Sequence, residues 1–200
     1  MNNHDIENRL HQEGYKYICG TDEVGRGCIA GSVTACAIIM KPDSNISGIT
    51  DSKKISDKKR RELYQKIIDD AISYKVVFIE PSIIDEINIL EASRLAMEKA
   101  IEGLNIKPDY ILTDAMRIHT DILYEDIIKG DLLSYTISCA SIIAKVERDD
   151  YMIKLSKEYP MYEWNKNKGY PTKKHKNALK EFGITKYHRK SYMPVKELID

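Results

Sequence analysis

A short polar connection between two apolar segments limits how this chain can fold. Residues 17–22 (YICGTD) and 33–40 (VTACAIIM) each have the length and composition of a β-strand. The loop after the first segment matches the glycine fingerprint of dinucleotide-binding proteins, which must open a helix inside a parallel crossover of roughly a dozen residues or more. Because only residues 28–32 separate this loop from the second segment, the connection predicts an antiparallel hairpin and excludes the dinucleotide site.

The rest of the chain contains further patterns of strand and helix type. Ser56 is a suitable N-cap for a segment whose apolar residues recur at helical spacing. We expect further strands at 74–80, 110–114 and 125–131, and helices at 56–72, at 82–104 in two pieces, at 137–159 and at 172–182. Strands that come first and then alternate with helices predict an α/β fold with a mixed sheet.

Composition adds limits on size and compartment. The 200 residues, 42% apolar and 31% charged, suffice for one domain with a small appendage. No apolar run approaches the roughly 20 residues that span a bilayer, and the polar N-terminus lacks a secretion signal. The four cysteines show no CxxC spacing, so we expect reduced thiols that pack as small apolar residues. These features predict a cytoplasmic protein without a membrane segment.

The charge is balanced overall but unevenly distributed. Residues 165–190 contain nine Lys or Arg and one acidic residue, and residues 51–61 contain six and two. A block of like charge is often just a solvated face. Two basic blocks in an otherwise acidic chain also fit a surface that follows phosphates beside a cation site.

Acidic residues follow three of the apolar segments. Asp22, Asp114 and Asp131 each come after a segment that we expect to form a strand, so each is predicted at a strand end. Carboxylates that converge there repel one another and bind Mg²⁺ or Mn²⁺ through hard oxygens. A single acid is usually a solvated loop residue, and only the recurrence favours a metal site. If the first strand ends at Asp22, the turn can bring Glu23 to the same side.

The loop after these acids is also suited to contact a ligand. Gly25 and Gly27 suit a departure from strand geometry, and glycines allow a ligand to approach the backbone closely. Arg26 between them can form a two-pronged contact with phosphate.

Seven short motifs occur in an order and spacing that are specific to one family. They are GTDEVGRG at 20–27, DSKKIS at 51–56, ILTDAM at 111–116, KGDLLS at 129–134, ISCASIIAKVERD at 137–149, NKGYPTKKH at 167–175 and HRKSYMPV at 188–195. With these motifs the chain resembles the ribonuclease HII family, the type 2 ribonucleases H, from about residue 17 to about residue 195. Arg26, where type 3 enzymes have a lysine-like residue, and the lack of a long N-terminal substrate-binding domain favour type 2.

The resemblance implies a fold and an activity. The fold is α/β, a ribonuclease H-like mixed sheet flanked by helices over residues 1–160, with a basic, mostly helical segment at 161–200 that covers the substrate groove. The activity is that of an endonuclease that hydrolyses RNA in RNA/DNA hybrids and cuts 5′ of single ribonucleotides in duplex DNA. It leaves 5′-phosphate and 3′-OH ends, and it removes misincorporated ribonucleotides and RNA primers. We expect a monomer.

The resemblance also implies the site residues. The catalytic, metal-binding acids are Asp22, Glu23, Asp114 and Asp131, which hold Mg²⁺ or Mn²⁺, two ions in the active complex, with Asp22 as the bridging ligand. The substrate-binding residues are Gly25, Arg26 and Gly27 at the ribose 2′-OH and adjacent phosphate, Lys53 at a phosphate, and Tyr170 on the sugar at the RNA–DNA junction.

Some positions depart from the family pattern or stay open. Cys28 and Ser32 replace expected prolines and Cys139 an expected alanine, which affects loop stiffness and packing but removes no ligand. Lys145 and Arg148 face either substrate phosphate or nearby acids, and we favour the structural role. Two alternative functions remain: another ribonuclease H-like nuclease that cleaves DNA, and a non-catalytic nucleic-acid-binding module.

Overall fold

The centre of the molecule is a five-stranded sheet, which a computed structural model describes together with its helices for residues 3–49 and 55–199. Its strands are β1 (Ile18–Val24), β2 (Val33–Met40), β3 (Ala71–Ile79), β4 (Tyr110–Asp114) and β5 (Tyr124–Ile127), in the order β3-β2-β1-β4-β5. The strands β1, β2 and β3 pair antiparallel, whereas β4 is parallel to β1 and β5 is parallel to β4. The predicted hairpin and the predicted mixed α/β sheet are therefore confirmed.

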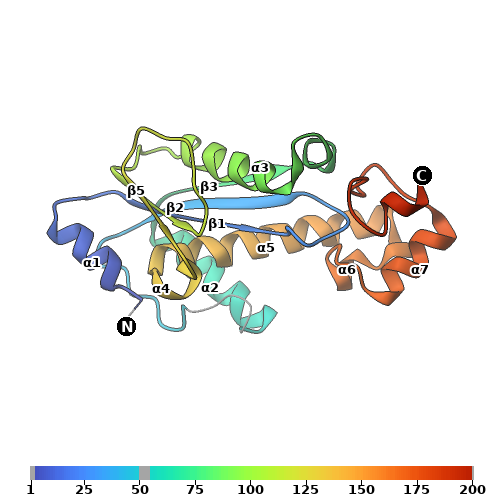
Figure 1. The fold of residues 1–200 in the computed structure, drawn as a ribbon. Helices are drawn as coiled ribbons and strands as arrows, with labels where there is room; N and C mark the ends of the chain where they lie inside the picture. The colour runs from blue at the N-terminus through green and yellow to red at the C-terminus, as the bar shows by residue number, and fades with distance from the viewer. Residues whose placement is uncertain (1–2, 50–54, 200) are drawn as a thin grey trace.

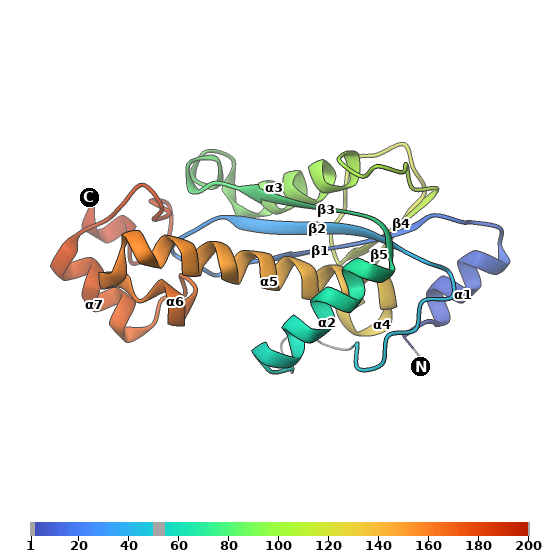
Figure 2. The ribbon, with the colours of Figure 1, turned by 180° about the vertical axis from the view of Figure 1, so that it is seen from behind.

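Helices cover both faces of this sheet (Figures 1 and 2). Helix α3 (Pro81–Glu102) packs on one face, and α2 (Asp57–Asp70) and α5 (Tyr135–Glu158) pack on the other. The short helices α1 (Asp5–Gln12) and α4 (Gly130–Leu133) lie at the end of the molecule where α5 begins. Helix α5 packs along both β1 and β2 and so makes the most extensive contact between its face of the sheet and the helices there.

Polar caps set the helix boundaries. The Ser56 side chain accepts from the N–H of Lys59 and begins α2 as expected. Within α3, Asn88 has a φ of 67°, and its Oδ1 accepts from the N–H groups of Leu90 and Glu91. Asn88 thus ends one helical piece and caps the next, which confirms the expectation of two pieces.

The C-terminal part forms a small helical extension at the far end of α5 (Figure 1). It contains η1 (Pro160–Tyr162), α6 (Trp164–Asn167), α7 (Lys173–Phe182) and η2 (Lys196–Leu198) around the fully buried Trp164. Asp85 of α3 accepts hydrogen bonds from the N–H groups of Lys190 and Ser191, and these bonds join the extension to α3. In the described part of the chain, no helix is both long and apolar enough to cross a membrane.

Two of the three expected strand-end acids lie elsewhere. Strand β1 continues past Asp22 to Val24, because its ladder with β2 continues and pairs Asp22 with Cys36. Asp131 lies in α4, since β5 loses its partner where β4 ends and the chain turns into a helix after Lys129, which has a φ of 61°. Only Asp114 ends its strand as predicted.

Candidate active site

An open pocket of about 360 Å³ surrounds the end of β1. Asp22 and Glu23 line it together with the following loop, residues 25–27. Asp114 enters from β4, and Tyr170 enters from the C-terminal extension. The fold thus joins three of the four predicted acids and four of the five predicted substrate-binding residues, although they come from distant parts of the chain.

The carboxylates in this pocket are crowded and poorly solvated. Burial raises the pKa of Asp22, and the charges of Glu23 and Asp114 raise it further. Burial also raises the pKa of Glu23, against the effect of Arg26, whose guanidinium lies 3.0 Å from Glu23 Oε1. The other oxygen, Glu23 Oε2, is buried and has no hydrogen-bond partner among the described residues. An unpaired buried carboxylate oxygen beside two further acids is suited to a hard divalent cation.

The two remaining acids lie beside each other. Asp114 Oδ1 accepts from the N–H of Gly130 at 2.7 Å, and Asp131 is the next residue. The buried Asp131 does not line the pocket itself, and its carbonyl accepts from Ser138 Oγ of α5 at 2.9 Å. As the described side chains stand, no three His, Cys, Asp or Glu residues form a ready metal-ligand group. The fourth acid is therefore adjacent to the pocket, next to the residue whose N–H holds Asp114.

The two loop glycines have different roles. Gly25 has a φ of 93°, and a Cβ there would lie 2.1 Å from Arg148 Nε, so both conformation and space require glycine. Gly27 is outside the left-handed region, and a Cβ there would approach Tyr170 Cε1 only to 3.9 Å. The expectation of a backbone departure is correct for Gly25, whereas Gly27 lies against the edge of the Tyr170 ring without the backbone strain of Gly25.

A buried hydrogen-bonded chain holds Tyr170 in place. His175 Nδ1 lies 2.9 Å from the carbonyl oxygen of Tyr170, so it carries the proton. Its Nε2 then accepts from the indole of Trp164 at 3.0 Å and from His188 Nε2 at 3.2 Å. Burial lowers the pKa of both histidines, that of His188 to about 3. Both rings are therefore neutral at physiological pH and organise the C-terminal extension around Tyr170.

One pocket residue, Ser141, was not found by sequence reasoning, and the structure gives the open position Lys145 the favoured pairing with a nearby acid. Ser141 of α5 donates a hydrogen bond to Asp22, and Lys145 lies one turn further along the same helix. Lys145 pairs with Asp149 at 2.7 Å and still borders the pocket. Their spacing of four residues on the sheet-facing side of α5 was the available signal, but it does not indicate which strand residue they meet.

The open position Arg148 and the predicted phosphate contact Lys53 have different outcomes. Arg148 is fully buried and donates to main-chain carbonyls, so it has the structural role, although its partner is not Asp149. Lys53 lies outside the described residues, so its proposed phosphate contact stays a prediction.

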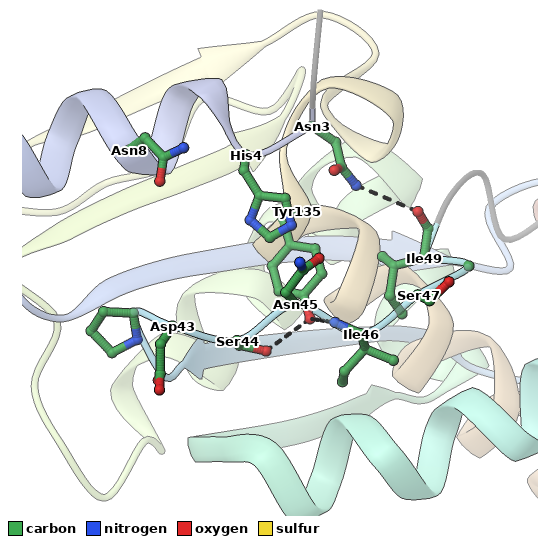
Figure 3. A pocket seen from close by; sticks show the side chains of 12 residues that line it. Asn3, His4, Asn8, Asp43, Ser44, Asn45, Ile46, Ser47, Ile49 and Tyr135 are labelled. Atoms are coloured by element: carbon green, nitrogen blue, oxygen red, sulfur yellow. Dashed lines mark hydrogen bonds between the residues drawn. The ribbon is translucent and has the colours of Figure 1, made fainter.

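A second cavity, of about 400 Å³, shares no lining residue with the acidic pocket. It lies between the start of α1 and the segment 42–49, and Tyr135 forms its floor (Figure 3). The Tyr135 hydroxyl bonds to Ser44 Oγ at 2.8 Å and accepts from the N–H of Ile46 at 3.0 Å. Asp43 is the one acid among its described lining residues, so this cavity is not the candidate active site.

The mixed sheet with its flanking helices defines an α/β protein of ribonuclease H-like architecture. Comparisons with known proteins identify the family within this class of fold. The family model Ribonuclease HII matches residues 19–195. Ribonuclease HII of Caldicellulosiruptor bescii is 47% identical over 190 residues, which cover 94% of this chain and 92% of that protein. The chain belongs to the ribonuclease HII family.

Solved structures agree with this assignment. The ribonuclease H2 of Pyrococcus horikoshii has a TM-score of 0.75 at 26% identity and covers 90% of this chain and 96% of its own. Bst-RNase HIII, solved in complex with Mn²⁺, shares the fold with a TM-score of 0.72 at 16% identity, over 94% of this chain and 71% of its own. The protein is thus a ribonuclease H, a divalent-metal-dependent endonuclease that acts on RNA paired with DNA.

Proposed function

We propose that this protein, beyond hydrolysing RNA in hybrids, cuts 5′ of single ribonucleotides in duplex DNA and leaves 5′-phosphate and 3′-OH ends. The observation that carries this proposal is that the loop of residues 25–27 and the half-exposed Tyr170 ring line one pocket together with the acids. One ribonucleotide differs from its neighbours only by a 2′-OH, so recognition needs a backbone that can approach closely and a surface that fits the sugar. The cellular role would be removal of misincorporated ribonucleotides and RNA primers, by a cytoplasmic monomer.

Asp22, Glu23, Asp114 and Asp131 would hold two Mg²⁺ or Mn²⁺ ions. The crowding of Asp22 and the unpaired Glu23 Oε2 support this assignment. When bound, such ions stabilise the charge on the attacking and leaving oxygens of the phosphodiester. Ser141 and the N–H of Glu23 orient the Asp22 carboxylate, which is our candidate for the bridging ligand.

The substrate would lie across the pocket and along the C-terminal extension. Residues 1–160 form the catalytic part in this proposal, and residues 161–200 cover the groove. Arg26, whose side chain is half exposed, can exchange Glu23 for a substrate phosphate once a cation neutralises the acid. Lys53 would contact a phosphate as well. The lysines of the extension would follow the DNA backbone without sequence preference.

We expect Arg26→Ala and Tyr170→Ala each to lower kcat/KM on a single-ribonucleotide duplex by about 10-fold or more. The reason is the loss of a phosphate contact in one variant and of a sugar-packing ring in the other. Steady-state kinetics on this duplex and on an RNA/DNA hybrid measure the change in discrimination. Tyr74→Ala, a similarly exposed tyrosine on β3, is the matched control and should match the wild type. Unchanged cleavage by both site variants would exclude these residues from substrate recognition.

The function itself is tested with an end-labelled DNA duplex that carries one ribonucleotide. Mg²⁺ or Mn²⁺ should give one cut at the 5′ side of the ribonucleotide, a chelator should abolish it, and an all-DNA duplex should stay intact. Equal cleavage of all-DNA would favour the other ribonuclease H-like nucleases. Binding of the duplex without a cut in either metal would favour a non-catalytic module.

A further inference from the structure

A carboxylate that the proposed chemistry does not use is buried at the start of α5. Glu7 of α1 is only 5% exposed, and its Oε2 is buried without a hydrogen-bond partner among the described residues. Its Oε1 accepts three hydrogen bonds, from Ser134 Oγ at 2.5 Å, from the N–H of Thr136 at 2.9 Å and from Thr136 Oγ1 at 2.8 Å. All three donors are neutral, so the burial of this carboxylate is costly. Its position therefore calls for a physical reason.

Glu7 completes the N-terminal cap of α5 from a distant part of the chain. The first N–H groups of a helix have no acceptor within the helix. Ser134, the N-cap residue, accepts from the N–H of Ile137 at 3.2 Å, and Glu7 accepts from that of Thr136. A negative charge is also favourable at this end of the helix dipole. Glu7 therefore fixes the first turn of α5.

The junction between α4 and α5 also positions two of the proposed metal-binding acids. The N–H of Gly130 donates to Asp114 Oδ1 at 2.7 Å, and the carbonyl of Gly130 accepts from the N–H of Ser134 at 2.9 Å. Ser138 Oγ donates to the carbonyls of Asp131 and Ser134, at 2.9 and 2.8 Å. A shift of Ser134 would therefore displace the backbone that positions both acids.

Helix α1 is itself held firmly against the sheet. Leu10 is fully buried, in one cluster with residues of β1, β4 and α5. Arg9 of the same helix pairs with Glu125 of β5 at 2.7 Å. These contacts fix Glu7 relative to β1 and β4, the strands that carry the other three acids. Glu7 thus connects the α4–α5 junction to those strands.

We propose that Glu7 is a positioning residue for the cation site, because it holds the α4–α5 junction where Asp114 and Asp131 can contribute to that site. This inference rests on the proposed function, since it takes these acids as metal ligands. Glu7 acts through Ser134 and Thr136 and contributes no ligand itself. Its costly burial is explained by the need of mutually repelling carboxylates for support from the structure around them.

Calorimetric titration with Mn²⁺, in the absence of substrate, tests this role. Glu7→Ala removes the acceptor, and we expect the Kd for Mn²⁺ to rise about 10-fold or more. Glu7→Gln keeps one acceptor oxygen, so the Kd should rise only about 3-fold. KM for an RNA/DNA hybrid should stay within about 2-fold, because no substrate contact is lost. Glu13→Gln is the matched control, since it makes the same change of charge on an exposed side chain at the other end of α1.

Two further measurements separate positioning from a general loss of stability. Ile84→Val weakens the core under α3, on the other face of the sheet, and should leave the Kd for Mn²⁺ unchanged. Amide hydrogen exchange at Gly130 and Ser134, measured without metal, should be about 5-fold faster or more in the Glu7 variants than in Ile84→Val. If Glu7→Ala does not fold, Glu7→Gln undergoes the same measurements.

An unchanged Kd for Mn²⁺ in the folded Glu7 variants, or an equal rise in Ile84→Val, would overturn the inference. If the wild type binds no Mn²⁺, the proposed function fails instead. Hydrogen exchange at Gly130 and Ser134 then decides on Glu7, because it reports the position of the junction without any metal. Exchange at wild-type rates in the Glu7 variants would exclude the positioning role.

Discussion

Asp22→Asn is expected to reduce hydrolysis of an RNA/DNA hybrid by about 1000-fold or more and, without divalent ions, to raise the Tm. Asp22 is buried and its pKa is raised, first by burial and then by Glu23 and Asp114. A carboxyl whose folded pKa lies above its unfolded pKa destabilises the fold at neutral pH, where it must ionise against repulsion. That penalty fades as the pH falls through the raised folded pKa. The amide removes it at every pH.

Hydrolysis rates and thermal unfolding, each with and without Mg²⁺, measure both effects. Mg²⁺ should raise the Tm of the wild type but not that of Asp22→Asn, because the variant lacks the bridging carboxylate. Asp126→Asn is the control, since Asp126 is an exposed acid on β5 outside the pocket. Full activity of Asp22→Asn, or a lower Tm without metal, would contradict the assignment of Asp22 to the metal site.

Gly20→Ala is expected to lower the free energy of unfolding by about 3 kcal/mol or more and to leave little folded protein. A Cβ at Gly20 would lie 2.4 Å from the carbonyl carbon of Thr136 and 2.5 Å from the nitrogen of Ile137, in the first turn of α5. These are main-chain atoms, so no side-chain rotation relieves the overlap. The first turn is also held in place, because Glu7 Oε1 accepts from the N–H of Thr136 at 2.9 Å.

Urea unfolding of Gly20→Ala measures this cost, and Gly183→Ala is its control. Gly183 has a φ of 75° but open space around its Cβ position, so that substitution costs only backbone strain of about 1 kcal/mol. A loss within 1 kcal/mol for Gly20→Ala would mean that α5 can move away from β1. Such movement would also separate Ser141 from Asp22, so the same close contact that stabilises the sheet orients the candidate ligand.

The sequence by itself determined the local structure and the family. The short connection after residues 17–22 allowed only a hairpin, and Ser56 marked the start of α2. These features depend on chain length, hydrophobic spacing and capping, which act over a few residues. The ordered motifs identified the family, because their combined spacing is specific even though each motif alone is modest, and the roles of the acids and the loop stay predictions from that resemblance.

Only the tertiary structure decided how these residues meet. The ladder between β1 and β2 extended β1 past Asp22, and the loss of a partner for β5 moved Asp131 into a helix. Contacts between distant segments placed Ser141 at Asp22 and placed Glu7 at the start of α5, across more than 100 residues of chain. Such contacts depend on how helices pack against the sheet, and local spacing carries no record of that packing.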